Sequence, residues 1–287
     1  MKYVEYILFR CLVFLVSITP FRLLYVISDA CSFMMQYIIR YRVETVSANL
    51  KNAFPEKSYD EIKKITRQFY KYLCDVSLES LKGYYSYKQL LTRYQFLNPE
   101  VVNRYQENGQ SVIIVLGHYG NWEWGTQVVG SVFTHKLVTF YKPLTNRYVD
   151  KFTYKLRAKR NMELASIYEG KFFFRSDKGE PKAFFLVSDQ SPGNAKKAIW
   201  LKFLNQDTAC LRGVETYAKL FNLPVIFMDV QRVRRGYYTV EMEVICDKPS
   251  ETFPGEITEM YLNKLEDIII KKPENWLWSH RRWKLKR

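Results

Sequence analysis

The sequence predicts an α/β protein, with a central mixed β-sheet flanked by helices and an N-terminal helical segment that anchors it to a membrane. Three observations favour this fold class. Short strand-like runs such as Val112–Leu116 alternate with helical patterns, which is typical of largely parallel sheets. Gly236 predicts a hairpin between strands at 224–233 and 238–245, so at least one pair is antiparallel. Residues 1–40 are apolar but interrupted by charges.

The composition narrows the classes of partner. The 287 residues include 44 Lys or Arg against 29 Asp or Glu, a formal net charge of +15. This excess indicates a polyanionic partner: nucleic acid, an anionic lipid surface or a phosphorylated substrate. The 22 Tyr and 19 Phe suit a protein at a lipid–water interface. The five cysteines have no paired spacing and only three histidines are present, so we expect no disulfide framework, no metal site and no organic cofactor.

The N-terminal segment is too often interrupted to predict a full membrane span. Arg10 and Arg22 bracket an uncharged run of eleven residues at 11–21, short of the roughly 18 apolar residues that a spanning helix needs. We therefore divide the chain into a membrane-associating helical segment at 1–40 and one catalytic domain at 41–287. An amphipathic or re-entrant anchor is the expected form of the first segment, and a buried helical hairpin is the alternative.

The remaining elements follow from periodicity and capping signals. Residues 41–91 are expected to be helical, and Ser58 with Glu61 predicts a capping box at the start of one helix. The other elements are listed by range. Strands are expected at 137–141, 162–167 and 183–188, and helices at 146–159, 170–177, 212–221 and 256–271.

The candidate catalytic residues lie where the strand Val112–Leu116 ends. His118 and Glu123 follow it across a glycine-flanked turn, and open α/β folds place their ligand crevices at such strand ends. With His118 in the turn and Glu123 in the next helix, for which Asn121 is the predicted N-cap, the two side chains can converge. A neutral imidazole held by a carboxylate takes a proton from an alcohol near neutral pH. A hydrogen-bonded core pair is the alternative.

Several motifs resemble those of one enzyme family. Gly-His-x-Gly-Asn-Trp-Glu at 117–123 resembles the His-x-x-x-x-Glu block of the late acyltransferases of lipid A biosynthesis, the lauroyl and myristoyl transferases. The similarity extends from about Tyr41 through Tyr-Lys-Pro-Leu-x-Asn at 141–146 and Asp-Gln at 189–190 to Trp-x-Trp-x-His-Arg-Arg-Trp-Lys at 276–284. Asn205 replaces a glycine of the family pattern, and we expect it to adopt the left-handed conformation there.

The resemblance implies a fold like that of the glycerolipid acyltransferases and a function to match. Acyl carrier protein would be the donor, a lipid A precursor the acceptor, and the cytoplasmic face of the inner membrane the location, with peripheral or monotopic attachment. His118 would be the general base and Glu123 would fix its tautomer. Arg157 would hold phosphate or sugar groups of the acceptor, unless it belongs to a solvated helix face.

Three further residues are expected at the substrate site: Asn121, Asp189 and Gln190. For Asp189 three roles stay open, namely pairing with His118, orienting Arg157 or capping its own turn. No Gly-x-Ser-x-Gly elbow is present, which argues against a covalent serine route.

Two other functions compete with this one. The acceptor could instead be another bacterial lipid, such as an aminolipid, a glycolipid or a lysophospholipid. A basic nucleic-acid-binding protein is a more remote alternative, and because no zinc-finger or RNP module is present we expect no nucleic-acid partner. The C-terminal tryptophans beside Arg281 and Arg282 suit a membrane surface or single-stranded nucleic acid equally well.

Overall fold

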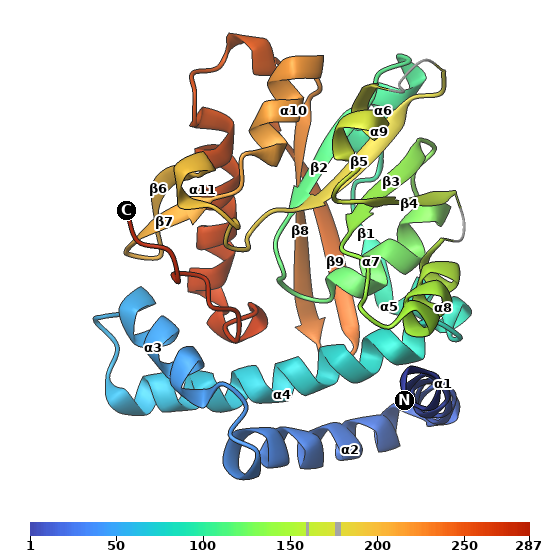
Figure 1. The fold of residues 1–287 in the computed structure, drawn as a ribbon, viewed down its shortest axis with the longest axis vertical. Helices are drawn as coiled ribbons and strands as arrows, with labels where there is room; N and C mark the ends of the chain where they lie inside the picture. The colour runs from blue at the N-terminus through green and yellow to red at the C-terminus, as the bar shows by residue number, and fades with distance from the viewer. Residues whose placement is uncertain (159–160, 176–178) are drawn as a thin grey trace.

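The computed structural model describes residues 1–158, 161–175 and 179–287 and confirms the α/β fold (Figure 1). Within these residues the main sheet has seven strands in the order β1-β9-β8-β2-β5-β3-β4. Neighbouring strands pair in parallel except at the β8–β9 hairpin, which makes the sheet mixed as predicted. Its strands are β1 (Tyr94–Phe96), β2 (Val112–Leu116), β3 (Lys136–Tyr141), β4 (Met162–Ser166), β5 (Lys182–Val187), β8 (Val225–Arg234) and β9 (Tyr237–Cys246).

A separate antiparallel hairpin is formed by β6 (Ile199–Phe203) and β7 (Gln206–Cys210). Its two-residue turn places Leu204 and Asn205 at φ values of 49° and 62°. Both central residues of a type I′ turn need a positive φ, and asparagine tolerates it better than most residues. The expected left-handed conformation of Asn205 is therefore confirmed.

The predicted helices form at the predicted places, with small changes at their ends. The α-helices are α1 (Lys2–Ile18), α2 (Phe21–Phe33), α3 (Val43–Ala53), α4 (Tyr59–Gly83), α5 (Tyr87–Arg93), α6 (Glu100–Glu107), α7 (Trp122–Val128), α8 (Arg147–Arg157), α9 (Gly170–Arg175), α10 (Gly213–Phe221) and α11 (Glu256–Lys271). Single turns are the π-helical η1 (Met34–Ile38) and the 3₁₀ segments η2 (Val129–Ser131), η3 (Ala195–Lys197), η4 (Pro249–Glu251) and η5 (Pro273–Asn275). The predicted ends at 159 and 177 lie outside the described residues.

The central strand β2 is buried on both faces. Ile113 and Val115 join the apolar cluster that includes α10 and α11, whereas Ile114 and Leu116 join the cluster that includes α6 and α7. Alternate residues of a strand point to opposite faces, so a strand covered on both sides needs apolar residues throughout. The uninterrupted run Val112–Leu116 is explained by this double burial.

Helix α4 crosses the sheet at the end where β2, β5 and β8 terminate, with α2 on its far side (Figure 1). It begins with the predicted capping box, in which the Ser58 side chain accepts from the Glu61 backbone and the Glu61 carboxylate accepts from Ser58. One face of α4 is buried in the core, and its tyrosine Tyr72 reaches the turn that follows β2. This helix therefore supports the strand ends where the candidate site lies.

The N-terminal helices are buried on one side and apolar on the other. The inner side of α2 binds α4, where the Ser28 hydroxyl donates to Asp75 Oδ1 at 2.6 Å. The outward residues Leu8, Phe14 and Val26 are 65%, 61% and 65% exposed. We name the set the N-terminal apolar surface: Tyr3, Val4, Ile7, Leu8, Leu12, Phe14, Leu15, Ile18, Leu23, Val26, Ile27, Phe33, Met34, Tyr37, Ile38 and Ile39. These helices are therefore not a hairpin buried in the core.

No described helix combines the length and the apolar character that crossing a membrane requires.

Candidate active site

His118 and Asp189 meet at the carboxyl edge of the sheet. Strands β2 and β5 pair in parallel with Leu116 opposite Val187, so the residues that follow leave the sheet side by side. Asp189 Oδ1 lies 2.6 Å from His118 Nδ1, and its Oδ2 accepts from the His118 backbone N–H at 2.7 Å. The carboxylate therefore fixes both the backbone and the ring of His118, and leaves Nε2 for chemistry.

The electrostatics favour a histidine that takes up a proton readily. Burial lowers the pKa of His118, but the nearby Asp189 carboxylate and its hydrogen bond outweigh burial and raise that pKa above 6.5. Burial would raise the pKa of Asp189, but His118 and the surrounding donors instead lower it to about 2. Asp189 is thus ionised at neutral pH, and the neutral imidazole keeps its proton on Nδ1 and its lone pair on Nε2.

Gln190 supplies the next polar group around the ring. Its Nε2 lies 3.2 Å from His118 Nε2, in position to donate to that lone pair. The Trp122 ring lies edge-on to the imidazole with centroids 5.0 Å apart, and the His118 side chain is 17% exposed. The reactive nitrogen therefore faces an amide donor and a partly open surface.

Glu123 does not hold the imidazole, contrary to the sequence-based expectation. Both of its carboxylate oxygens lie 2.8 Å from Arg157 Nη2, and the half-buried Tyr84 lies near the same guanidinium. Its charge still reaches the ring, because it contributes to the raised pKa of His118. The structure thus brings two predicted site residues, Glu123 and Arg157, together as an ion pair beside the His118–Asp189 pair, which we call the dyad.

Asn121 caps α7 as predicted. Its Oδ1 accepts from the Trp124 backbone N–H at 3.0 Å, and its Nδ2 donates to Glu79 Oε2 at 2.9 Å. The residue is fully buried, with both ends of its amide engaged by the protein. We therefore assign Asn121 to holding the turn, and its predicted contact with substrate does not fit this placement.

Part of the C-terminal motif is buried and packs against the His118–Asp189 pair. Trp276 and Trp278 are buried, and Trp276 Nε1 donates to Asp189 Oδ2 at 2.8 Å. His280 Nε2 accepts from the Ser191 backbone N–H at 3.1 Å, and burial lowers the pKa of His280 to about 4. Arg282 is 1% exposed and donates to the Ala209 carbonyl at 2.7 Å.

The expectation of a surface role is thus wrong for these tryptophans and for Arg282. Trp276 is a site residue that the sequence analysis missed. The signal was present, since an indole N–H is a donor that needs a partner when it is buried. The pattern of tryptophans beside arginines indicated a membrane surface or single-stranded nucleic acid instead.

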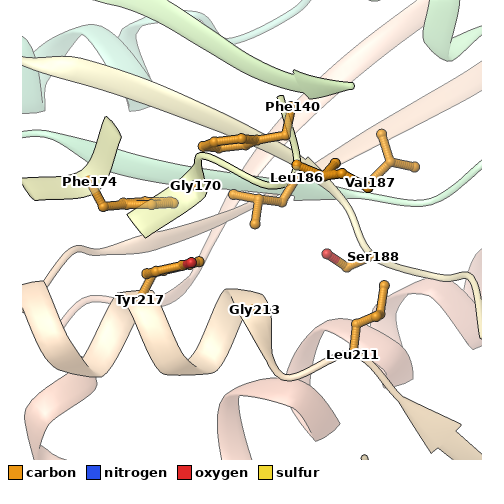
Figure 2. Close-up of a pocket in the computed structure, with 10 residues that line it drawn as sticks. Phe140, Gly170, Phe174, Leu186, Val187, Ser188, Leu211, Gly213 and Tyr217 are labelled. Carbon is orange, nitrogen blue, oxygen red and sulfur yellow. The ribbon is translucent and has the colours of Figure 1, made fainter. Parts of the chain in front are cut away.

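An apolar cavity of about 320 Å³ lies between the ends of β3 and β5 and the start of α10 (Figure 2). Figure 2 shows Phe140, Phe174 and Tyr217 at one end, and Ser188 with Leu211 at the other. Phe174 and Tyr217 stack with their centroids 4.0 Å apart, which makes that end rigid. Ser188, which lines the end of the cavity away from the stacked rings, directly precedes Asp189 in the chain.

Within the described residues, no group of three or more His, Cys, Asp or Glu side chains is arranged to hold a metal ion.

The fold and the site define an α/β protein with a largely buried histidine–aspartate pair at the carboxyl edge of its sheet, an arrangement typical of enzymes that use general-base catalysis. The chain belongs to the bacterial lipid A biosynthesis acyltransferase family, whose model matches residues 1–285, and it is accordingly an enzyme that transfers acyl groups. It is 21% identical over 272 residues to the lipid A biosynthesis palmitoleoyltransferase of Escherichia coli K12. The lauroyltransferase of the same organism is 20% identical over 270 residues. Each alignment covers 92% of this chain and 86% of the relative.

Proposed function

We propose that this protein transfers a fatty acyl chain from acyl carrier protein to a hydroxyl of a lipid A precursor at the cytoplasmic face of the inner membrane. The observation that carries the proposal is the His118–Asp189 pair at the carboxyl edge of the sheet, where Ser188, the residue before Asp189, lines an apolar cavity. Family membership supports acyl transfer in lipid A biosynthesis. The donor, the acceptor and the location are our inference.

His118 acts as the general base. Its Nε2 removes the proton of the acceptor hydroxyl while the oxygen attacks the thioester carbonyl carbon. The C–S bond of the tetrahedral intermediate then breaks, and the imidazolium returns the proton to the thiolate. Asp189 stabilises the imidazolium through the 2.6 Å contact with Nδ1. The Gln190 amide, 3.2 Å from Nε2, is the side chain that we propose to donate to the developing oxyanion.

Glu123 and Arg157 form the acceptor side of the site in this proposal. The guanidinium matches phosphate oxygens through its planar set of donors. Glu123 binds one nitrogen of the guanidinium, Nη2. It therefore orients Arg157 toward a phosphate or sugar group of the acceptor. The Glu123 carboxylate also favours the protonated imidazole that forms during the reaction.

The cavity beside Ser188 takes the acyl chain of the donor. An alkyl chain is stabilised by leaving water, at roughly 0.8 kcal/mol per buried methylene. With its carbonyl next to Ser188, the chain points its methyl end at the stacked rings of Phe174 and Tyr217 (Figure 2). The aromatic end of the cavity then limits the length of chain that fits.

The N-terminal apolar surface is the proposed membrane contact. Helices with one packed side and one exposed apolar side are typical of proteins that lie in the plane of a bilayer surface. The test is liposome flotation of Val26→Ser with Ile27→Ser, which should reduce binding to vesicles of phosphatidylglycerol and phosphatidylethanolamine. Phe253→Ser is the control, because Phe253 is 78% exposed but lies between η4 and α11, outside the N-terminal apolar surface. Equal flotation of all three proteins contradicts this contact.

The activity is tested with purified protein, an acyl carrier protein thioester and candidate acceptors. Mass spectrometry should show one added acyl group on a lipid A precursor with a free hydroxyl, and none on an aminolipid, a different type of glycolipid or a lysophospholipid. His118→Gln removes the base, and His135→Gln is its control because His135 is buried away from the site and binds the Gln110 carbonyl. Acylation of another lipid alone overturns the proposed acceptor, and equal activity of the two variants overturns the proposed base.

A further inference from the structure

Glu79 is a fully buried carboxylate that the proposed chemistry does not use. It lies on α4 and accepts three side-chain hydrogen bonds from three different elements. The donors are the Tyr25 hydroxyl on α2 at 2.8 Å, the Asn121 amide at 2.9 Å and the Tyr238 hydroxyl on β9 at 2.7 Å. A buried carboxylate is costly unless its oxygens are satisfied, so each of these donors holds its own element close to Glu79.

The Asn121 contact reaches the turn that carries His118. Asn121 caps α7, and the backbone carbonyl of Glu79 accepts from Trp124 Nε1 at 2.7 Å. Tyr72, also on α4, donates its hydroxyl to the Gly120 carbonyl at 2.7 Å. The stretch 120–124 is therefore attached to α4 at three points.

That turn has little freedom to adopt another arrangement. Gly120 has φ of +61°, and a Cβ there would lie 2.4 Å from the Val230 carbonyl oxygen. A rigid connection between α4 and the turn transmits a shift in α4 or Glu79 to His118, two residues before Gly120.

The Tyr25 contact reaches the N-terminal apolar surface. Tyr25 points inward from α2, while Leu23 and Val26 on the same helix are 53% and 65% exposed. A second set of polar contacts ties the same helix to the hairpin β8–β9, because the Arg235 guanidinium bridges Asp29 on α2 and Asp75 on α4. Helix α2 thus has one side with exposed apolar residues and one side that is hydrogen-bonded, through Glu79, to the turn that carries His118.

We propose that Glu79 is a positioning residue that couples α2 to the turn that carries His118. Binding of α2 to a bilayer then orders His118 and raises turnover. The inference rests on the membrane contact and acyl transfer proposed above, and adds a regulation of that site by the lipid surface. The route is short, running from the Tyr25 hydroxyl through the Glu79 carboxylate to the Asn121 amide. Glu79 touches neither substrate nor His118 in this scheme, and acts only through Asn121.

Two matched tyrosines test the coupling. Tyr25→Phe and Tyr238→Phe each remove one hydroxyl that donates to Glu79, but only the first breaks the connection to α2. The measurement is kcat in the absence and presence of phosphatidylglycerol vesicles, with flotation to verify that each variant still binds them. Wild type and Tyr238→Phe should be stimulated about fivefold or more, a typical coupling between distinct sites. Tyr25→Phe should lose most of this stimulation while it still floats.

Hydrogen exchange of the amides at 118–125 gives a readout that needs no turnover. Vesicles should slow this exchange in wild type and in Tyr238→Phe, and leave it unchanged in Tyr25→Phe. The inference is overturned if wild type shows no stimulation and no protection, if Tyr25→Phe responds like wild type, or if both variants lose the response equally. Absence of acyl transfer in every sample overturns the proposed activity instead, and the exchange data still decide the coupling.

Discussion

Replacing Asp189 by Asn tests the dyad most sharply, because the change preserves volume but reverses one hydrogen bond. The carboxylate accepts from three donors: the ring and the backbone N–H of His118, and the indole of Trp276. An Asn oxygen that takes the place of Oδ2 keeps two of these bonds. The NH₂ group of the introduced asparagine then faces His118 Nδ1 and cannot accept a hydrogen bond from it. The imidazole proton therefore moves to Nε2, which gives the wrong tautomer for a base.

The expected loss is close to the full contribution of general-base catalysis, about 10²–10⁴-fold in turnover. The pH dependence of the activity shows in which direction the pKa of His118 shifts. In wild type the pKa of His118 is raised above 6.5, so activity falls as the pH drops through that raised value. Without the Asp189 charge, burial dominates and lowers the pKa, so the acidic limb of the residual activity moves to lower pH.

The assay is the pH profile of kcat/KM with an acyl carrier protein thioester, together with ¹⁵N NMR of the His118 ring to identify the tautomer. Glu123→Gln serves as the comparison, since it removes a nearby charge but no hydrogen bond to the ring. The reasoning is refuted if Asp189→Asn retains more than about a tenth of wild-type turnover with an unshifted acidic limb.

Three further outcomes are expected. His118→Ala should lower turnover by about 10²–10⁴-fold with an unchanged melting temperature, and a tenth or more of wild-type turnover in the purified variant would contradict its role as base. Tyr217→Ala should shift the preferred donor to longer acyl chains, measured by competition among thioesters of different length, and an unshifted preference would show that the chain lies elsewhere. Arg282→Ala should lower the free energy of unfolding by about 1.5–3 kcal/mol in urea titration, because it removes a buried charged hydrogen bond. Lys284→Ala, on the exposed side of the same segment, should stay within about 0.5 kcal/mol, so equal losses would place Arg282 at the surface.

Patterns formed by residues close together in the sequence were sufficient to predict most of the fold. The capping box at Ser58, the apolar run of β2 and the helix at 256–271 each depend on residues close together in the chain, and each was predicted where it forms. The mixed sheet followed from the single hairpin at Gly236.

The carboxylate partner of His118 depends on contacts between distant parts of the chain. Glu123 is five residues away and was favoured by proximity, whereas Asp189 is 71 residues away and arrives through the parallel register of β2 and β5. Strand order is set by packing across the whole sheet, so the sequence left three roles open for Asp189. The burial of Trp276 and Arg282 is equally non-local, since composition alone cannot distinguish a buried indole beside an arginine from one at a membrane surface.

The attachment of the C-terminal segment has a consequence for synthesis of the protein. Asn49 Nδ2 donates to the Trp278 carbonyl at 2.9 Å and Arg42 Nη1 to the Ser279 carbonyl at 2.8 Å, across 229 and 237 residues. These bonds hold Trp276 against Asp189, so a nascent chain still on the ribosome lacks the indole that fixes the carboxylate. At about 5–20 residues per second, roughly 5–20 s pass between the synthesis of Asp189 and that of Trp276. The N-terminal apolar surface emerges well before then, so the proposed membrane contact is available before the site around Asp189 is complete.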